Sequence, residues 1–254
     1  MPNAANLSVF VITRNEERDI EGCLMSVKDI ADEITLVDSG STDRTLEIAR
    51  RFTDKIFHND WKGYSAQKEY ALDRVKGPWV LNIDADERVT PALAEEIKGL
   101  LQTGNGNFKG YEVPFRHFFL GKRLRFGGVQ GEIHVRLFLK NSASYGKESV
   151  HEKIRVMGQI GRLRHPIDHQ SYRDIADYLE KCNEYTSMIA RRKWESGKRF
   201  HAWHHLRLPY EFLVRYLFKL GFLDGGPGLT YALLSSYYSW LKFIKLRDFE
   251  GKKQ

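Results

Sequence analysis

Two aspartates, Asp84 and Asp86, stand at the end of the apolar run 79–83 with one alanine between them. Carboxylate oxygens are preferred ligands of Mg²⁺ and Mn²⁺, and a metal held by one or two carboxylates takes its other ligands from water and substrate phosphates. Many surface turns contain Asp-x-Asp, but here the pair closes an almost wholly apolar strand. The spacing therefore predicts a divalent-metal site for a phosphate-bearing ligand.

Two more polar clusters end apolar, β-branched runs: Thr13-Arg14-Asn15-Glu16-Glu17 and Asp38-Ser39-Gly40-Ser41-Thr42-Asp43. In open α/β sheets, ligands bind outside the carboxyl ends of the strands. Each cluster alone could simply cap a helix, since Asp, Ser and Asn favour that position. Three clusters at equivalent strand ends favour one composite site.

The elements that must position these clusters follow from the hydrophobic pattern. Predicted strands at 7–13, 33–38, 55–57 and 79–84 alternate with amphipathic stretches at 16–28, 42–52, 65–76 and 91–101. This alternation is typical of βαβ units and a largely parallel sheet. Ser41 or Thr42 could cap the second helix, and Thr90 followed by Pro91 should begin the fourth.

A basic region follows the loop at 104–107. Residues 109–164 contain twelve Lys or Arg and four Glu, and alternation at 134–139 and 150–156 predicts short strands. We expect this half to complete the same domain. Residues 172–194 have a helical pattern.

The composition bounds the class of protein. With 254 residues and 42% hydrophobic content, the chain can build a core and is not a disordered tail protein. Cys23 and Cys182 are the two cysteines, which excludes a disulfide scaffold and a zinc ribbon and indicates a reducing cytoplasm. The sequence has no signal-peptide pattern and no apolar run of about 18 residues.

The last fifth of the chain is basic and aromatic. Residues 199–254 contain nine Lys or Arg and four acidic residues, within a net charge of +7. Arg207, Glu211, Arg215 and Lys219 recur every four residues and form a narrow polar stripe beside a wide apolar face. This pattern predicts that 206–246 lies in a membrane interface. The alternative is a pair of helices packed on the domain or on a second subunit.

Other nucleotide-binding classes lack their signatures. No G-x-G-x-x-G follows the first strand and no G-x-x-x-x-G-K-[ST] occurs, which argues against a dinucleotide site and a P-loop ATPase. A basic nucleic-acid-binding protein stays an alternative, because the region 109–164 also contains aromatics. A nucleotidyltransferase, which also uses paired aspartates, is a weaker alternative because no glycine-rich basic loop follows the first strand.

Three motifs together resemble the family 2 inverting glycosyltransferases: Val11-Ile12-Thr13-Arg14-Asn15-Glu16-Glu17, Val37-Asp38-Ser39-Gly40-Ser41-Thr42-Asp43 and Asn82-Ile83-Asp84-Ala85-Asp86-Glu87. Through Val150-His151-Glu152 and His165-Pro166-Ile167-Asp168-His169, the chain is most similar to the lipopolysaccharide-core β-1,4-glucosyltransferase-like subgroup. The resemblance implies a GT-A fold, with a Rossmann-like, mostly parallel central sheet and flanking helices. It also implies a UDP-sugar donor and Mg²⁺ or Mn²⁺.

The resemblance further implies residue roles. Asp86 matches the direct metal ligand, and Asp38 matches the residue that binds uracil. The residues that match nucleotide-sugar-binding positions are Thr13, Asn15, Glu16, Asp38, Ser39, Gly40, Lys68 and Asp84. Lys68 could equally be an ordinary helix lysine.

Inverting transfer also needs a general base for the acceptor hydroxyl. Glu152 is our candidate, and Asp168 is the reserve. The family often places its base in a Glu-Asp pair before a Q-x-x-R-W helix, and neither feature occurs here. Glu152 could instead pair with Lys153 or Arg155. His151 could be a second metal ligand, an acceptor contact or a structural residue. His165 and His169 could line the acceptor cleft or be structural.

The sequence thus predicts a GT-A catalytic domain at 1–170, with a nucleotide-sugar-binding half at 1–104 and an acceptor-side half at 105–170. A helical extension, 171–254, contacts the membrane. We expect transfer of glucose or another hexose to an anionic glycan or lipid-linked acceptor of the cell envelope. The enzyme would act on the cytoplasmic face of the inner membrane, with no nucleic-acid partner.

Overall fold

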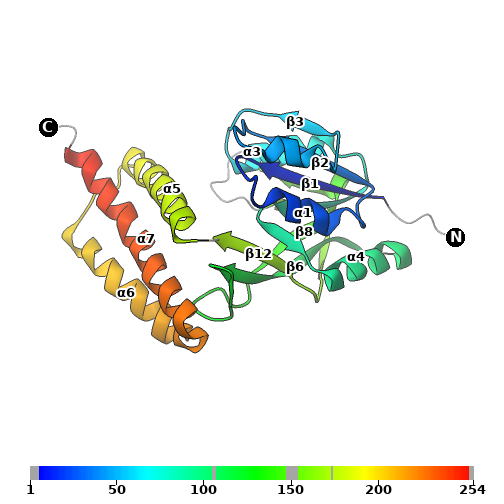
Figure 1. The fold of residues 1–254 in the computed structure, drawn as a ribbon. Helices are drawn as coiled ribbons and strands as arrows, with labels where there is room; N and C mark the ends of the chain where they lie inside the picture. The colour runs from blue at the N-terminus through cyan, green and yellow to red at the C-terminus, as the bar shows by residue number, and fades with distance from the viewer. Residues whose placement is uncertain (1–5, 105–106, 147–153, 173, 252–254) are drawn as a thin grey trace. The chain divides into compact units, whose positions relative to one another are not determined.

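The computed structural model describes residues 6–104, 107–146, 154–172 and 174–251. Its central sheet has the strand order β3-β2-β1-β4-β8-β6-β12-β5 (Figure 1). The first four of these strands run parallel: β1 (Leu7–Thr13), β2 (Glu33–Asp38), β3 (Ile56–His58) and β4 (Trp79–Asp84). For β1, β2 and β4 these are the predicted bounds, and β3 lies one residue later than predicted.

The basic half adds antiparallel strands to the same sheet, as expected. β8 (Ile133–Leu139) pairs with β4 and with β6 (Phe108–Phe119), and β12 (Ile167–Tyr172) pairs with β5 (Glu87–Val89). Two short strands, β7 (Lys122–Leu124) and β11 (Gln159–Arg162), also pair with β6. The strand predicted at 150–156 is described from Ile154 onward, where β10 (Ile154–Val156) pairs with β9 (Ala143–Tyr145).

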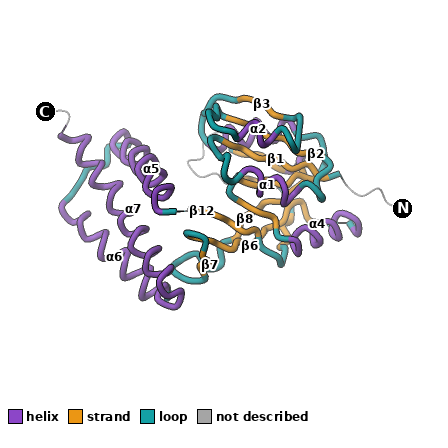
Figure 2. The backbone as a smooth tube through the Cα atoms, viewed as in Figure 1, coloured by secondary structure: helices purple, strands orange, loops and turns teal. Residues whose placement is uncertain are grey.

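Four helices lie close to the predicted stretches (Figure 2). They are α1 (Ile20–Val27), α2 (Thr45–Ala49), α3 (Tyr64–Arg74) and α4 (Pro91–Thr103). Of these, α1 and α2 are shorter than predicted, α3 is one residue shorter, and α4 is two residues longer. Thr90 caps α4 as predicted, since its hydroxyl accepts a hydrogen bond from the N–H of Leu93 at 3.3 Å. Neither Ser41 nor Thr42 caps α2, whose N-cap position is Arg44. Both side chains are used in the loop described below.

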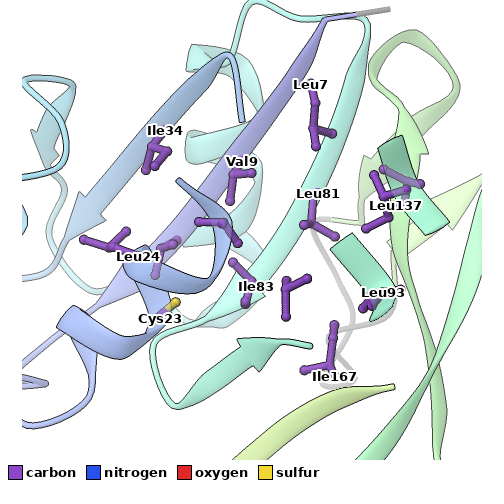
Figure 3. Close-up of a cluster of buried hydrophobic side chains, with 14 of the residues drawn as sticks. Leu7, Val9, Cys23, Leu24, Ile34, Leu81, Ile83, Leu93, Leu137 and Ile167 are labelled. Carbon is purple, nitrogen blue, oxygen red and sulfur yellow. The ribbon is translucent and has the colours of Figure 1, made fainter. Parts of the chain in front are cut away.

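The core covers both faces of the parallel strands, which explains their continuous apolar runs. Leu7, Val9 and Val11 of β1 belong to one buried cluster with Leu24 of α1 and Leu93 of α4 (Figure 3). The intervening residues of β1, Phe10 and Ile12, belong to a second cluster with Ala71 and Leu72 of α3. The α/β class that the sequence predicts is confirmed.

The C-terminal part is helical, as predicted. It contains α5 (Ile175–Glu195), α6 (Arg207–Leu213) with a π-helical turn at Val214–Phe218, and α7 (Gly225–Gly251). The run Gly225-Gly226-Pro227-Gly228 forms the first turn of α7. None of the described helices is long and apolar enough to cross a membrane.

By their contacts, the residues group into two compact units. The first unit contains residues 1–115 and 131–169, and the second contains residues 116–130 and 170–254. The predicted catalytic domain ends at residue 170, next to this boundary, but residues 116–130 group with the helices. Whether either unit is an independent domain stays a prediction.

Candidate functional site

The carboxyl ends of β1, β2 and β4 lie side by side. In the parallel register Thr13 is opposite Asp38, and Ile12 is opposite Asp84. Thr13 is buried, and its hydroxyl has no hydrogen-bond partner among the described residues. The register confirms that the first residues of the predicted clusters meet at one sheet edge.

The Asp38 carboxylate shapes the turn after β2. Its Oδ2 accepts hydrogen bonds from the backbone N–H groups of Gly40 (2.9 Å) and Ser41 (3.0 Å), and its Oδ1 accepts from the Ser41 hydroxyl. Gly40 has φ of +95°, a backbone conformation that favours glycine. Ser39 donates its N–H to the Thr13 carbonyl at 3.1 Å. Asp38, Ser39 and Gly40 therefore form one rigid turn, beside Thr13.

Asn15 joins the loop after β1 to the loop after β2. Its N–H donates to the Ser41 hydroxyl at 2.9 Å, and its side-chain oxygen accepts from the N–H of Thr42 at 2.8 Å. Asn15 has φ of +55°, in the left-handed region that asparagine tolerates better than most residues. The N–H of Glu16 donates to Thr45 at 2.8 Å. The predicted residues Asn15 and Glu16 are thus held against the second cluster.

Asp84 lies between two cations. Lys68 Nζ of α3 is 3.0 Å from Asp84 Oδ1, and Arg136 Nη2 of β8 is 2.9 Å from Asp84 Oδ2. Burial opposes the charge of Asp84, but the two cations outweigh it and lower its pKa far below the usual range. The Lys68 side chain is only 5% exposed, so Lys68 is not an ordinary solvated helix lysine.

Glu87 completes this charged group. Arg136 also donates to Glu87, whose other oxygen accepts the N–H of Asp84 at 2.9 Å. Burial raises the pKa of Glu87 to about 7 despite the attraction of Arg136. The Arg136 guanidinium also lies 5.2 Å from the centre of the Phe115 ring. Arg136 therefore holds the strand end that precedes Asp86.

Asp86 faces a histidine from the far end of the sheet. His169 Nε2 of β12 lies 3.2 Å from Asp86 Oδ2. Burial disfavours the charged imidazolium, but the hydrogen bond and charge of Asp86 prevail and raise the pKa of His169 to about 9. The carboxylate oxygen is a ligand that Mg²⁺ and Mn²⁺ prefer, and a neutral imidazole nitrogen is a common metal ligand, so this pair fits a divalent ion once the imidazole is deprotonated.

The donor set fits a metal that completes its coordination with substrate and water. Among the described residues, no group of three or more His, Cys, Asp or Glu side chains could hold an ion. Asp86 and His169 would thus supply two ligands, and the remaining ligands would come from a bound diphosphate and solvent. This is the arrangement expected of a metal that binds together with its nucleotide.

The structure describes some of the predicted base candidates and remaining histidines but not others. Glu152 and His151 lie outside the described residues. Asp168 lies on β12 opposite Arg88 of β5, next to His169. His165 Nδ1 is 2.9 Å from Glu96 Oε2, and Glu96 also accepts the N–H groups of residues 164 and 165. His165 therefore has a structural role in securing α4.

Sequence reasoning missed Arg136 and Glu87 and did not assign His169 to Asp86. Arg136 had a detectable signal, because it is a single cation within the otherwise apolar strand 135–139. Glu87 directly follows Asp86, so its burial was open to prediction. The pairing of His169 with Asp86 depends on the antiparallel register of β12 and β5, which the sequence does not reveal.

Comparisons with known proteins identify the family of the chain. The model of the family "Glycosyl transferase family 2" matches residues 8–154, more than half of the chain. The chain is 31% identical over 248 residues to the lipopolysaccharide core biosynthesis glycosyltransferase LpsC of Rhizobium meliloti, with 94% of this chain and 91% of LpsC covered. It is 29% identical to a glycosyltransferase of Rickettsia typhi, with 98% and 89% covered.

Two solved structures are also matched. S. aureus TarS (residues 1–349) matches with a TM-score of 0.45 and 14% identity, covering 98% of this chain and 92% of TarS. Glucosyl-3-phosphoglycerate synthase from Mycobacterium tuberculosis, in complex with Mn²⁺ and UDP-glucose, matches with a TM-score of 0.39 and 26% identity over 44% of each chain.

The family model covers all three strand-end motifs and the Arg136 strand, and the LpsC match extends over nearly the whole chain. The sequence left open three classes: a glycosyltransferase, a nucleic-acid-binding protein and a nucleotidyltransferase. These matches identify the first. The chain belongs to glycosyl transferase family 2 and is a glycosyltransferase.

Proposed function

We propose that the enzyme transfers a hexose, with inversion, from a UDP-sugar to a growing glycan of the lipopolysaccharide core. The observation that carries this proposal is the register that aligns Thr13 with Asp38 and Ile12 with Asp84, beside the Asp86–His169 pair. The similarity to LpsC, a lipopolysaccharide core biosynthesis glycosyltransferase, supports the acceptor class.

The donor nucleotide binds to the turns after β1 and β2. Thr13, Asn15 and Glu16 line the base and ribose pocket, and the turn of Asp38, Ser39 and Gly40 contacts the uracil. The hydrogen bonds that already fix both turns support this assignment. Because the turns are ordered before the donor binds, little conformational freedom is lost on binding. Lys68 and Asp84 lie at the ribose side, with Asp84 neutralised by its two cations.

Asp86 and His169 are the residues that would hold Mg²⁺ or Mn²⁺ when the donor diphosphate binds. The bound ion would neutralise the charge that develops on the leaving UDP. Lys68 and Arg136 keep Asp84 ionised. The N–H of Asp84 also donates to Glu87, so the strand end that carries Asp86 is held in place.

The acceptor is an anionic, lipid-linked oligosaccharide, to which the cationic half 109–164 is suited by its charge. Glu152 removes the proton from the acceptor hydroxyl as that hydroxyl attacks the anomeric carbon, and Asp168 is the reserve base. A lipid-linked acceptor places the enzyme on the cytoplasmic face of the inner membrane, and the C-terminal helical part makes the membrane contact.

The donor class is tested by thermal unfolding of the purified chain with UDP, GDP and their sugars, with and without Mn²⁺. A ligand at about 100 times its Kd stabilises the fold by about 2.7 kcal/mol. We expect UDP-hexoses to raise the Tm only when Mn²⁺ is present, and Asp86→Asn to remove that difference. An equal rise with GDP-sugars, or a rise that does not depend on Mn²⁺, would contradict the proposal.

A further inference from the structure

Exposed apolar side chains are concentrated in one segment of the second unit. Of the nineteen large apolar residues that are exposed in the described part of the chain, twelve lie within 203–233. Phe218 is 80% exposed and Leu206 is 67% exposed. Single exposed apolar residues are normal on protein surfaces, but such a concentration marks an interaction site. The twelve are Trp203, Leu206, Leu208, Tyr210, Leu213, Leu217, Phe218, Leu220, Phe222, Leu223, Leu229 and Leu233.

Three charged residues of the same segment, Arg207, Glu211 and Arg215, are less exposed than these twelve apolar residues and bond within the second unit. Glu211 is 20% exposed and accepts from Arg207 at 3.3 Å. Arg215 donates to the Tyr231 hydroxyl of α7 and to the Gly127 carbonyl, both at 3.2 Å. A surface helix in water has the opposite polarity, with charges outside and apolar residues inside. Three of the four residues of the polar stripe, Arg207, Glu211 and Arg215, thus lie on the side that packs on the protein, and the fourth, Lys219, is exposed.

Basic side chains surround this apolar segment. The two backbone N–H groups of Arg125 and Phe126 donate to the Asp224 carboxylate at 2.9 and 2.8 Å, and Gly127 donates to the Lys219 carbonyl. These bonds hold the loop after β7 against the start of α7. Within 116–130 and 198–233, every exposed charged residue is basic: Lys122, Arg123, Arg125, Lys198, Arg199 and Lys219.

The aromatic residues later in α7 are not part of this surface. Tyr237 and Tyr238 pack against the buried cluster of Phe119, Leu124, Tyr178 and Cys182, and Phe243 is buried with Ala190 and Leu246. Figure 1 shows α7 between α5 and α6, which explains why its second half is covered. The membrane segment that the sequence placed at 206–246 is therefore too long at its C-terminal end.

We propose that residues 203–233 lie flat in the interface of a membrane rich in anionic phospholipid, with the basic residues of 122–125 on the headgroups. This inference deepens the proposed membrane location and rests on it. Trp203 and Tyr210 suit the boundary between headgroups and acyl chains. A second copy of the chain fits this surface poorly, because a two-fold interface would bring basic rims of like charge together.

The test is flotation of the purified full-length chain with vesicles of phosphatidylcholine, or of phosphatidylcholine and phosphatidylglycerol in equal parts. We expect binding to the anionic vesicles that weakens in high salt. The triple variant Leu206→Ser, Leu217→Ser, Phe218→Ser should bind at least about tenfold more weakly. The triple variant Lys122→Gln, Arg123→Gln, Arg125→Gln should lose about a hundredfold, since each basic residue near an anionic surface contributes about fivefold.

Matched controls change equally exposed side chains in the first unit: Met25→Ser with Met157→Ser, and Lys28→Gln with Arg50→Gln and Lys76→Gln. These controls should bind vesicles like the unchanged chain. Phe218→Ser alone serves if the triple apolar variant does not fold, and it should weaken binding in the same direction.

Two results would overturn the inference. One is an unchanged chain that floats with neither vesicle type. The other is a dimer in solution that Phe218→Ser dissociates while vesicle binding stays the same, which would assign the surface to a second copy. Flotation uses no donor or acceptor. A failure to float would therefore contradict the membrane inference without bearing on the UDP-sugar reaction, and a failure to bind UDP would contradict the proposed reaction without bearing on flotation.

Discussion

His169 Nε2 lies 3.2 Å from Asp86 Oδ2, although the two residues are 83 positions apart in the sequence. The pairing arises because β12 runs antiparallel to β5, which begins directly after Asp86. The second aspartate of the Asp-x-Asp pair thus has a nitrogen donor beside it, whereas the first is occupied by Lys68 and Arg136.

The first prediction concerns these two donors. Asp86→Asn should lower kcat by about a thousandfold or more, because metal stabilisation of the leaving group contributes several kcal/mol. His169→Asn should weaken Mn²⁺ binding by at least about tenfold. The measurements are the transfer rate from the UDP-sugar and a Mn²⁺ titration. His165→Asn is the control, because His165 pairs with Glu96, and normal Mn²⁺ binding by both Asp86→Asn and His169→Asn would refute the site.

The second prediction concerns stability. Arg136→Met leaves Glu87 buried without its cation and Asp84 paired with Lys68 alone, so the free energy of unfolding should fall by about 3–5 kcal/mol. The control is Arg51→Met, which removes an exposed pair with Glu21 at 3.1 Å and should cost about 0–1 kcal/mol. Urea unfolding of both variants measures the difference. Similar losses in the two variants would show that the Arg136 cluster does not stabilise the sheet.

The third prediction is a pH dependence at Glu33, far from the candidate metal ligands. Glu33 accepts hydrogen bonds from Ser8 Oγ (2.6 Å), the Lys76 N–H (2.7 Å) and Lys55 Nζ (2.8 Å). Burial opposes its charge, but these bonds prevail and lower its pKa. A carboxyl with a lowered pKa stabilises the fold above its unfolded pKa, and this stability is lost as the pH falls through the folded pKa.

Glu33→Gln should therefore cost about 1–3 kcal/mol at neutral pH, and the difference should shrink as the pH falls below about 4.3. Unfolding free energies of both chains across this pH range measure the effect. Glu95→Gln, at an exposed position, is the control and should show no comparable change. A difference between Glu33→Gln and the unchanged chain that stays constant down to acidic pH would contradict this assignment.

The fourth prediction separates the two candidate bases. Glu152→Gln should bind the donor normally yet lower kcat by about 10²–10⁴-fold, the usual contribution of a general base. Asp168→Asn should then keep most of its activity. UDP binding and single-turnover transfer measure the two steps. A fast Glu152→Gln variant with a slow Asp168→Asn variant would assign the base to Asp168.

The bounds of β1, β2 and β4 could be predicted to the residue because both faces of these three strands are buried. Their apolar runs begin and end sharply, and polar residues follow each run at once. Helix α2 could not be predicted as well, since the pattern favoured 42–52 and the helix covers Thr45–Ala49. Ser41 and Thr42 bond to Asn15 in the neighbouring loop instead of capping the helix, and such a contact between loops leaves no periodic signal.

The sequence could predict the site residues that stand at the end of a single strand, but not the partners that other elements bring to them. Asp84 and Asp86 stand out by position, but the partners of Asp84 come from α3 and β8, and the partner of Asp86 comes from β12. In the second unit, the periodicity of Arg207, Glu211 and Arg215 was read correctly as a stripe. Periodicity alone does not say which side of a helix packs on the protein. Only the structure shows that these residues face the protein.

The dependence of the site on strand ends limits which changes in chain length the enzyme tolerates. Side chains alternate between the faces of a strand, so one residue inserted within β4 would turn Asp84 away from Lys68 and Arg136. An insertion in the connection at 28–32, before β2, leaves the register of Thr13 and Asp38 intact. Natural and engineered variants of this enzyme should therefore gain and lose residues at the amino-terminal edge of the parallel strands, and keep the opposite edge at constant length.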